Sequence, residues 1–208
     1  MLPKKERFKP RKSPAQSRST HTVDAIFEAT IQVLLSQGPS KLTTTKIADR
    51  AGVSVGTLYQ YFGDKQSLIS SVLEKHLVEV TEFVEAACDE NRHKTLEVMT
   101  TNLIKAFFNA KFSHPEASKA LYAVASEVEG GQMVTTLMQR SQASICGLLS
   151  SASDAHFEDP ITATFTVSTA MVGPVQALLA IDAPQQYQDK ICSHLCKMSY
   201  SYLREIST

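Results

Sequence analysis

Apolar side chains recur along most of this chain at the three- and four-residue spacing of an amphipathic helix. The first clear run lies between Val23 and Leu34, and the last between Tyr187 and Tyr202. Half-buried strands would need sustained alternation of apolar and polar residues, and no segment shows it. With 208 residues, 43% of them hydrophobic, the chain is long enough to bury a core. The spacing therefore predicts an all-α fold with about nine helices.

Capping residues and helix breakers divide this pattern into segments. Gly38-Pro39 ends the first helix, Gly52 ends a short one, and Asp159-Pro160 joins an N-cap to a first-turn proline. The predicted helices cover about residues 22–37, 43–51, 55–61, 64–88, 94–112, 115–128, 132–152, 160–181 and 184–205.

Charge is distributed unevenly along a chain whose formal net charge is zero. Residues 1–20 carry seven Lys or Arg against the single acidic residue Glu6, and the excess of basic residues is the same through residue 65. The remainder is acidic, so an anionic partner is expected for the N-terminal part alone. Residues 1–17 are also rich in Ser and Pro and poor in apolar side chains, which predicts a disordered basic arm.

Two short helices joined by a glycine turn, with longer helices on either side, indicate a helix-turn-helix. The second short helix must enter a DNA major groove, so the first must approach it closely through small side chains. Ala48 and Ala51 provide these, Gly52 provides the turn, and Val53 and Leu58 provide the packing between the helices. A small helical hairpin that binds no DNA would show the same pattern, so the pattern alone leaves that alternative open.

The literal sequence is more specific. The run TTTKIADRAGVSVGTLYQYF, Thr43 to Phe62, followed by GDKQSL through Leu68, closely resembles the DNA-binding signature of the TetR/AcrR family of transcriptional regulators. The resemblance covers about residues 18–77, with the helix-turn-helix at 43–62. Residues 78–208 match the family in length and helical content only, and the resemblance implies that they form an effector-binding and dimerisation domain.

The resemblance implies a homodimeric, sequence-specific regulator, usually a repressor, that binds a palindromic operator in double-stranded DNA and is released by a small-molecule effector. Thr44 and Thr45 should meet phosphate, Thr57 and Gln60 are chemically able to read base edges, and Tyr59 should bind phosphate. The positions that the resemblance assigns to DNA contacts are Thr44, Thr45, Val55, Gly56, Thr57, Tyr59, Gln60, Tyr61 and Lys65.

In the C-terminal part the family typically pairs its last two helices with those of a second subunit. On that basis the expected dimer interface contains Phe165, Val172, Leu179, Ile191, Leu195, Met198 and Tyr202. The middle helices typically enclose an effector pocket, for which the candidate residues are Met99, Leu103, Phe107, Tyr122, Met138 and Phe165. At helical spacing such residues are also typical of ordinary core, and that alternative stays open.

Other classes of protein find little support. No phosphate-binding glycine loop, zinc-protease helix or nucleophile-elbow motif occurs, so no enzyme, catalytic residue or cofactor is predicted. Cys192, His194 and Cys196 are too few for a closed zinc site, so no metal is predicted, and the scattered cysteines favour a reducing compartment. The uncharged stretch 161–181 is long enough to span a bilayer, but its Thr and Ser residues favour a buried helix. A cytoplasmic location is expected, and the alternatives are a regulator without small-molecule control and one tethered to a membrane through 161–181.

Overall fold

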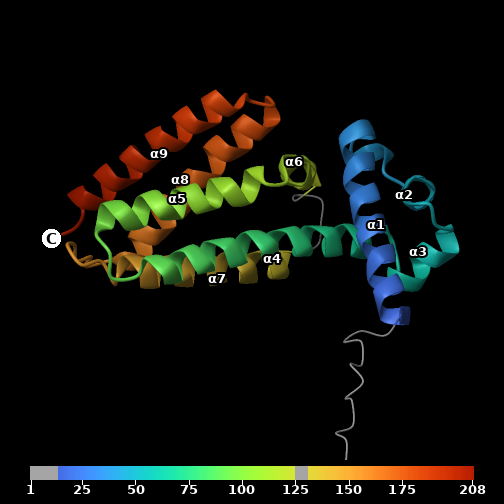
Figure 1. The fold of residues 1–208 in the computed structure, drawn as a ribbon, viewed down its shortest axis with the longest axis horizontal. Helices are drawn as coiled ribbons and strands as arrows, with labels where there is room; N and C mark the ends of the chain where they lie inside the picture. Colours follow the sequence, from blue (N-terminus) through green and yellow to red (C-terminus); the bar gives the residue numbers. More distant parts are fainter. Residues whose placement is uncertain (1–13, 125–130) are drawn as a thin grey trace, which may run out of the picture. The chain divides into compact units, whose positions relative to one another are not determined.

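The structure, a computed structural model, describes the backbone of residues 14–124 and 131–208 and shows nine α-helices and no strand within these ranges (Figure 1). By their contacts the residues form two compact units, Met1–Lys65 and Gln66–Thr208, which we describe separately. The all-α prediction is confirmed. The predicted domain boundary at residue 77 falls inside α4, a helix that begins with the last residue of the first unit.

The first unit contains α1 (Pro14–Gln37), a short 3-10 turn (Pro39–Lys41), α2 (Thr44–Ala51) and α3 (Val55–Tyr61). The helix α1 begins eight residues before Thr22, so the prediction of a disordered arm is wrong for residues 14–17. Its first turns lack large apolar side chains, so apolar periodicity gave no sign of a helix there. The helix can begin at Pro14 because a proline is tolerated in the first turn. The rest of the predicted arm, residues 1–13, lies outside the described residues.

A small core holds α1, α2 and α3 together. Ile26 of α1, Ile47 and Ala48 of α2, and Leu58 of α3 are fully buried, and the Phe27 ring packs on the Phe62 ring with 5.7 Å between centroids. Ala48 allows α2 to approach its neighbours closely because it carries a single methyl group. The predicted small inner face of the helix-turn-helix is thus confirmed at Ala48.

The second unit is a bundle of six helices, five of which follow α4 (Lys65–Asn91). These are α5 (Leu96–Phe112), α6 (Pro115–Val124), α7 (Gly131–Leu149), α8 (Pro160–Ala180) and α9 (Gln185–Glu205). In Figure 1, α5 lies along α9, and α8 contacts α6, α7 and α9. The end predicted for the α6 segment, residues 125–128, lies outside the described residues.

The uncharged stretch 161–181 forms α8, which is embedded in this bundle. Ala163, Val167, Met171, Val175 and Leu178 are buried in its core. Asp159 is the predicted N-cap: its carboxylate accepts a hydrogen bond of 3.0 Å from the Thr162 N–H. Among the described residues α8 is the one helix that is long and apolar enough to cross a membrane, and 39% of that stretch is buried.

Two helix ends in this unit differ from the prediction for reasons that involve contacts. The α7 helix ends at Leu149, because the N–H groups of Ser151 and Ala152 bond three residues back, to Leu148 and Leu149, in a tight turn. The α5 helix begins at Leu96 and not near residue 94, and its Leu96 N–H donates to the Asp154 carboxylate at 2.7 Å. This cap comes from a residue 58 positions away, so no local motif could predict it.

Candidate nucleic-acid interface

Local hydrogen bonds shape the turn between α2 and α3. The hydroxyl of Thr43 accepts a hydrogen bond from the Lys46 N–H at 3.3 Å and caps α2 at its start. At its end Gly52 adopts the left-handed conformation, with φ 69° and ψ 29°. The Val53 N–H then donates to the Ala48 carbonyl at 3.0 Å and directs the chain toward α3. The predicted glycine turn is confirmed. Glycine suits this position because residues with a Cβ adopt such a φ only under strain.

The second cap rigidifies α3 from its first residue. The Ser54 hydroxyl accepts a hydrogen bond from the Thr57 N–H at 3.0 Å and lies 2.8 Å from the Thr57 hydroxyl. Leu58 anchors the inner side of α3, since it is fully buried. A short helix of seven residues is marginal by itself, so these caps and this anchor are what hold it in place.

The outer side of α3 is exposed and uncharged. Gly56, Gln60, Tyr59 and Tyr61 are exposed, the two tyrosines by 49% and 38%, while Val55 and Thr57 are half-buried. Two large aromatic side chains and an amide are thus exposed together on a helix of only seven residues. The amide of Gln60 offers a donor and an acceptor together, which is the pairing that a base edge in the major groove requires.

One hydrogen bond joins this surface to the start of α2. The Tyr59 hydroxyl lies 3.3 Å from the Thr44 hydroxyl, and Thr45 next to it is exposed. These hydroxyls lie at a helix N-terminus, where backbone N–H groups without helical partners favour an anion. Lys65 donates to the Leu42 carbonyl at 3.4 Å and keeps further N–H donors for a phosphate.

The other basic residues of α2 have a different role. The ammonium of Lys46 donates to the Gln37 side chain at 2.6 Å and to the Lys41 carbonyl at 3.0 Å. Arg50 donates to the Gln32 side chain at 2.6 Å. Both therefore tie α2 to α1 and the turn that follows it.

The second unit contains a mostly apolar cavity of about 250 Å³, lined by α4, α5, α6, α7 and α8. Of the six residues predicted for an effector pocket, Phe107, Tyr122 and Met138 line it. Met99 and Leu103 are instead fully buried in the helical core, and Phe165 is 58% exposed on α8. Three of the six predicted residues therefore line a cavity, and periodicity cannot tell a cavity wall from solid core.

Polar groups that the sequence analysis missed lie at one side of this cavity. Lys111 is only 5% exposed, and its ammonium lies 5.0 Å from the centroid of the Tyr122 ring. Ser118 donates its hydroxyl proton to the Lys111 carbonyl at 2.8 Å and lies 3.1 Å from His76 Nε2. Because that proton is used, His76 must be the donor to Ser118. A lysine between Ala110 and Phe112, one turn after Phe107, was the available signal.

Burial changes the pKa values of these groups. It lowers the pKa of His76 to about 4, with the positive charge of Lys111 as a second cause, so this histidine is neutral at pH 7. Burial also lowers the pKa of Lys111 to about 8 and raises the pKa of Tyr122 to about 12. At pH 7 the cavity therefore holds one cation, and no Asp or Glu lines it among the described residues.

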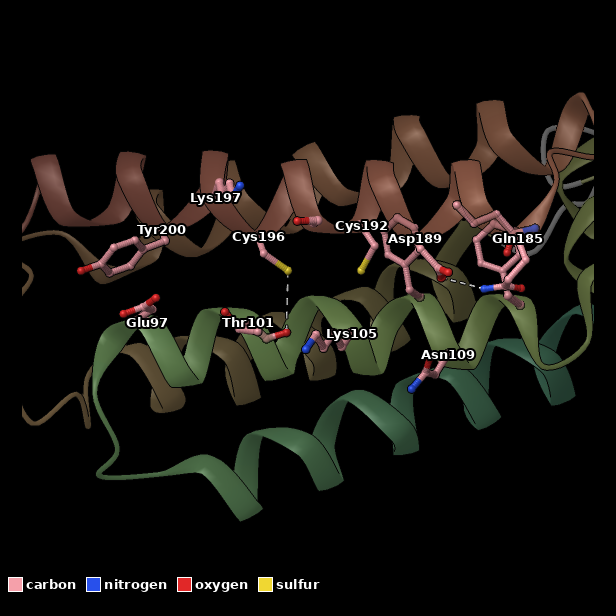
Figure 2. A pocket seen from close by; sticks show the side chains of 14 residues that line it. Glu97, Thr101, Lys105, Asn109, Gln185, Asp189, Cys192, Cys196, Lys197 and Tyr200 are labelled. Atoms are coloured by element: carbon pink, nitrogen blue, oxygen red, sulfur yellow. Dashed lines mark hydrogen bonds between the residues drawn. The ribbon is translucent and has the colours of Figure 1, made fainter.

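A second, more polar groove of about 610 Å³ lies between α5 and α9 (Figure 2). Cys192 and Cys196 point from α9 toward α5 there, and the Cys196 thiol lies 4.0 Å from the Thr101 carbonyl. A hydrogen bond from Cys192 lowers the pKa of Cys196 to about 7. Within residues 14–124 and 131–208 no group of three His, Cys, Asp or Glu side chains is arranged to hold a metal ion.

The residues predicted for a dimer interface divide by their exposure. Phe165 and Met198 are 58% and 52% exposed, and Val172, Ile191 and Tyr202 are half-buried. Leu179 and Leu195 are each 4% exposed. These two belong to the hydrophobic core of the bundle, so we remove them from the expected interface.

Comparison with known proteins identifies the family. Residues 26–72 match the model of the bacterial regulatory proteins of the tetR family, and residues 95–203 match the tetracyclin repressor-like C-terminal domain. The HTH-type transcriptional regulator BetI of Rhizobium meliloti is 29% identical over 114 residues, which is 55% of each chain. The HTH-type transcriptional repressor BepR of Brucella suis is 25% identical over 112 residues, 54% of this chain and 53% of BepR. The chain thus matches about half the length of these relatives, which are regulators and not enzymes.

Solved structures show the same fold over nearly the whole chain. The fatty acid degradation regulator FadR of Bacillus halodurans superposes with a TM-score of 0.73 at 16% identity, covering 94% of this chain and 99% of that one. FadR of Bacillus subtilis, solved in complex with stearoyl-CoA, gives 0.69 at 18% identity, covering 86% of this chain and 97% of that one. With both of its parts matched by family models, the chain belongs to the tetR family of bacterial regulatory proteins.

Proposed function

We propose that this protein is a homodimeric cytoplasmic repressor that binds a palindromic operator and is released when a small molecule occupies the cavity between α4 and α8. The observation that carries the proposal is the exposed face of α3, which two local caps and a buried leucine hold in position. A helix of this kind fits the major groove, which is about 12 Å wide.

Within this proposal the DNA contacts have separate roles. Gln60 and Thr57 read base edges, and Val55 and Gly56 allow the start of α3 to approach the bases closely. The hydroxyls of Thr44, Thr45, Tyr59 and Tyr61 and the ammonium of Lys65 bind phosphates and set the register of the protein on the duplex. The hydrogen bond between Thr44 and Tyr59 supports this assignment, because it holds two phosphate-binding groups side by side.

The proposed dimer interface uses the exposed apolar side chains of α8 and α9. Phe165 and Met198 are more than half exposed, and Ile191 and Tyr202 flank Met198 at helical spacing on α9. Covering such side chains with a second copy of the chain removes apolar surface from water. A dimer is also what a palindromic operator requires, since each half-site needs its own α3.

The test is selection of DNA by the purified full-length protein from fragments of its own genome, at about 150 mM salt to suppress non-specific binding. We expect recovery of a short palindrome. Gln60→Ala should then weaken discrimination at one base pair of each half-site by about 1–3 kcal/mol. Gln139→Ala, an exposed glutamine of α7, is the matched control and should select the same sequence as the wild type. Unchanged discrimination in Gln60→Ala would remove this residue from base recognition.

The basic N-terminal segment gives a second test. Deleting residues 1–13 removes six Lys or Arg and Glu6, so the dependence of affinity on salt should become shallower while the preferred site stays the same. Titrations of operator DNA at several salt concentrations measure this slope. A change in the preferred site would mean instead that the segment reads sequence, as arms that enter the minor groove do.

A further inference from the structure

Among the described residues, the cavity between α4 and α8 is lined by one lysine and by no acidic side chain. Lys111 is 95% buried at its wall, and it is the one charged side chain among the described residues that line it. Its ammonium faces the Tyr122 ring at 5.0 Å, and no described carboxylate forms an ion pair with it. A cation over an aromatic ring recovers only part of the free energy lost when the charge leaves water.

The groups around Lys111 cannot neutralise it. His76 of α4 is itself kept uncharged by burial and by the lysine, and the Ser118 hydroxyl already donates to the Lys111 carbonyl. Tyr122 of α6 is protonated at neutral pH, and burial raises its pKa further, to about 12. The helices α7 and α8 contribute only apolar and uncharged polar side chains to the lining. At pH 7 the lysine is mostly protonated, so its positive charge has no partner of opposite sign among the described residues that line the cavity.

We propose that the cavity binds a small hydrophobic monocarboxylate, whose carboxylate pairs with Lys111 and whose apolar body lies among Phe107, Leu121, Met138 and their neighbours. The proposal rests on the function proposed above, in which this cavity is the effector site. One cation matches one negative charge, whereas a phosphate dianion would leave a second charge unpaired among apolar side chains. A neutral apolar molecule would fill the same space but would leave Lys111 without a partner.

The volume limits the size of the ligand. Liquid water occupies about 30 Å³ per molecule, so a space of 250 Å³ corresponds to roughly eight to ten non-hydrogen atoms. A straight-chain acid such as octanoate, or an aromatic acid such as phenylacetate, is of this size. We therefore choose octanoate and phenylacetate as probes, with the neutral amide of each acid as the matched control.

Isothermal titration of the full-length protein at about pH 7 compares each acid with its amide. We expect the wild type to bind at least one acid about tenfold or more tightly than the corresponding amide. Lys111→Met should remove this preference, because the variant keeps the bulk of the side chain and loses the charge. Lys105→Met, an exposed lysine on the same helix, should retain it. Equal affinity of acid and amide for the wild type, a preserved preference in Lys111→Met, or binding of neither acid would overturn the proposal.

A second measurement does not depend on any variant. The acids stay ionised well above neutral pH, so their affinity for the wild type should fall as the pH rises past about 8, where Lys111 loses its proton. The affinity of the amides should stay nearly constant over the same range. Acid affinity that is constant from pH 7 to about pH 10 would show that Lys111 does not carry the interaction.

Two glutamates outside the described residues provide the remaining control. Glu127 and Glu129 follow α6 in the sequence, and a carboxylate from either would be a counter-ion that belongs to the protein. Glu127→Gln combined with Glu129→Gln should leave the affinity for the acid unchanged. If the acid binds this double variant about tenfold more tightly than the wild type, the protein supplies its own carboxylate to Lys111 and the proposal is wrong.

The readout on DNA separates this proposal from the function on which it rests. An acid that binds through Lys111 but leaves capture of operator DNA unchanged would support the binding site and contradict release by an effector. Release of DNA by the neutral amide with the same potency as the acid would support effector control and contradict recognition through Lys111.

Discussion

The two units of this protein satisfy their polar groups in different ways. In the first unit the side chains that cap α2 and α3 bond three positions away, as Thr43 does to Lys46 and Ser54 to Thr57, although Arg50 reaches Gln32 across 18 residues. In the second unit the important polar contacts join distant positions: Ser118 meets His76 across 42 residues, and Asp154 caps α5 across 58. Because the caps of α3 are local, its surface can be predicted from the sequence. The cavity depends on contacts between distant residues, so it cannot be predicted in the same way.

The difference also concerns where charge lies. The basic side chains of α2, Lys46 and Arg50, are hydrogen-bonded at the surface, whereas Lys111 is buried without a described carboxylate. Hydrogen-bonded charges at the surface suit a helix that is exposed to solvent when no DNA is bound. The buried charge of Lys111 is unfavourable unless a negative charge is supplied, and a binding site is where such a cost is expected.

The largest effect should come from a cavity in the small core of the first unit. Leu58→Ala removes a fully buried side chain from α3 and should lower the free energy of unfolding by about 2–5 kcal/mol. Because Leu58 anchors the DNA-facing helix, operator affinity should fall with it. Urea denaturation and DNA titration measure the two effects, with Tyr61→Phe, an exposed change on the same helix, as the control for stability. If operator affinity survives a destabilisation of this size, α3 does not need its anchor.

The next largest effect is expected in the second unit, where a substitution should raise the free energy of unfolding. Lys111→Met removes the buried charge and should raise the free energy of unfolding by roughly 1–3 kcal/mol at neutral pH. The pKa of Lys111 is near 8 in the folded protein and near 10.5 in the unfolded chain. Between these two pH values the unfolded chain binds more protons than the folded protein, so the free energy of unfolding of the wild type rises with pH. The wild type therefore becomes more stable with pH, and the advantage of the variant is full below pH 8 and lost above about 10.5.

Urea unfolding of both proteins at several pH values between about 7 and 10 tests this expectation. Lys105→Met should show no such advantage, because Lys105 is exposed on the same helix. A variant less stable than the wild type at pH 7 would show that Lys111 already has a partner, and that the two units do not differ in how they satisfy charge.

A smaller effect is expected from replacing the glycine of the turn, compared with the same replacement in the helix that follows it. Gly52→Ala places a Cβ at φ 69° and should cost about 1–2 kcal/mol, although no atom lies within 4 Å of that Cβ. Gly56→Ala is the matched change: its φ is ordinary and its Cβ would meet only the Ser54 hydroxyl at 3.7 Å. Since alanine favours helix, this variant should be neutral or more stable by up to about 1 kcal/mol. Thermal unfolding of the two variants compares them, and equal losses would show that backbone conformation is not the cause.

The first unit could be predicted in detail because its signals are local. The cap at Thr43, the glycine at position 52 and the buried Leu58 each follow from residues within one or two turns. The start of α1 at Pro14 was missed, since polar turns at the end of a helix leave no apolar pattern. In the second unit the helices were predicted to within a few residues, but Met99 and Phe107 could not be told apart as core and cavity wall.

The sequence by itself determined the helical architecture, the position of the turn between α2 and α3, and the family resemblance carried by residues 43–68. These depend on spacing, caps and backbone conformation, which act over a few residues. Only the tertiary structure decided that Leu179 and Leu195 face inward and that Lys111 reaches the wall of an apolar cavity beside His76 and Tyr122. A side chain's burial and its charge partners depend on elements that arrive from distant parts of the chain, and periodicity along one helix does not specify them.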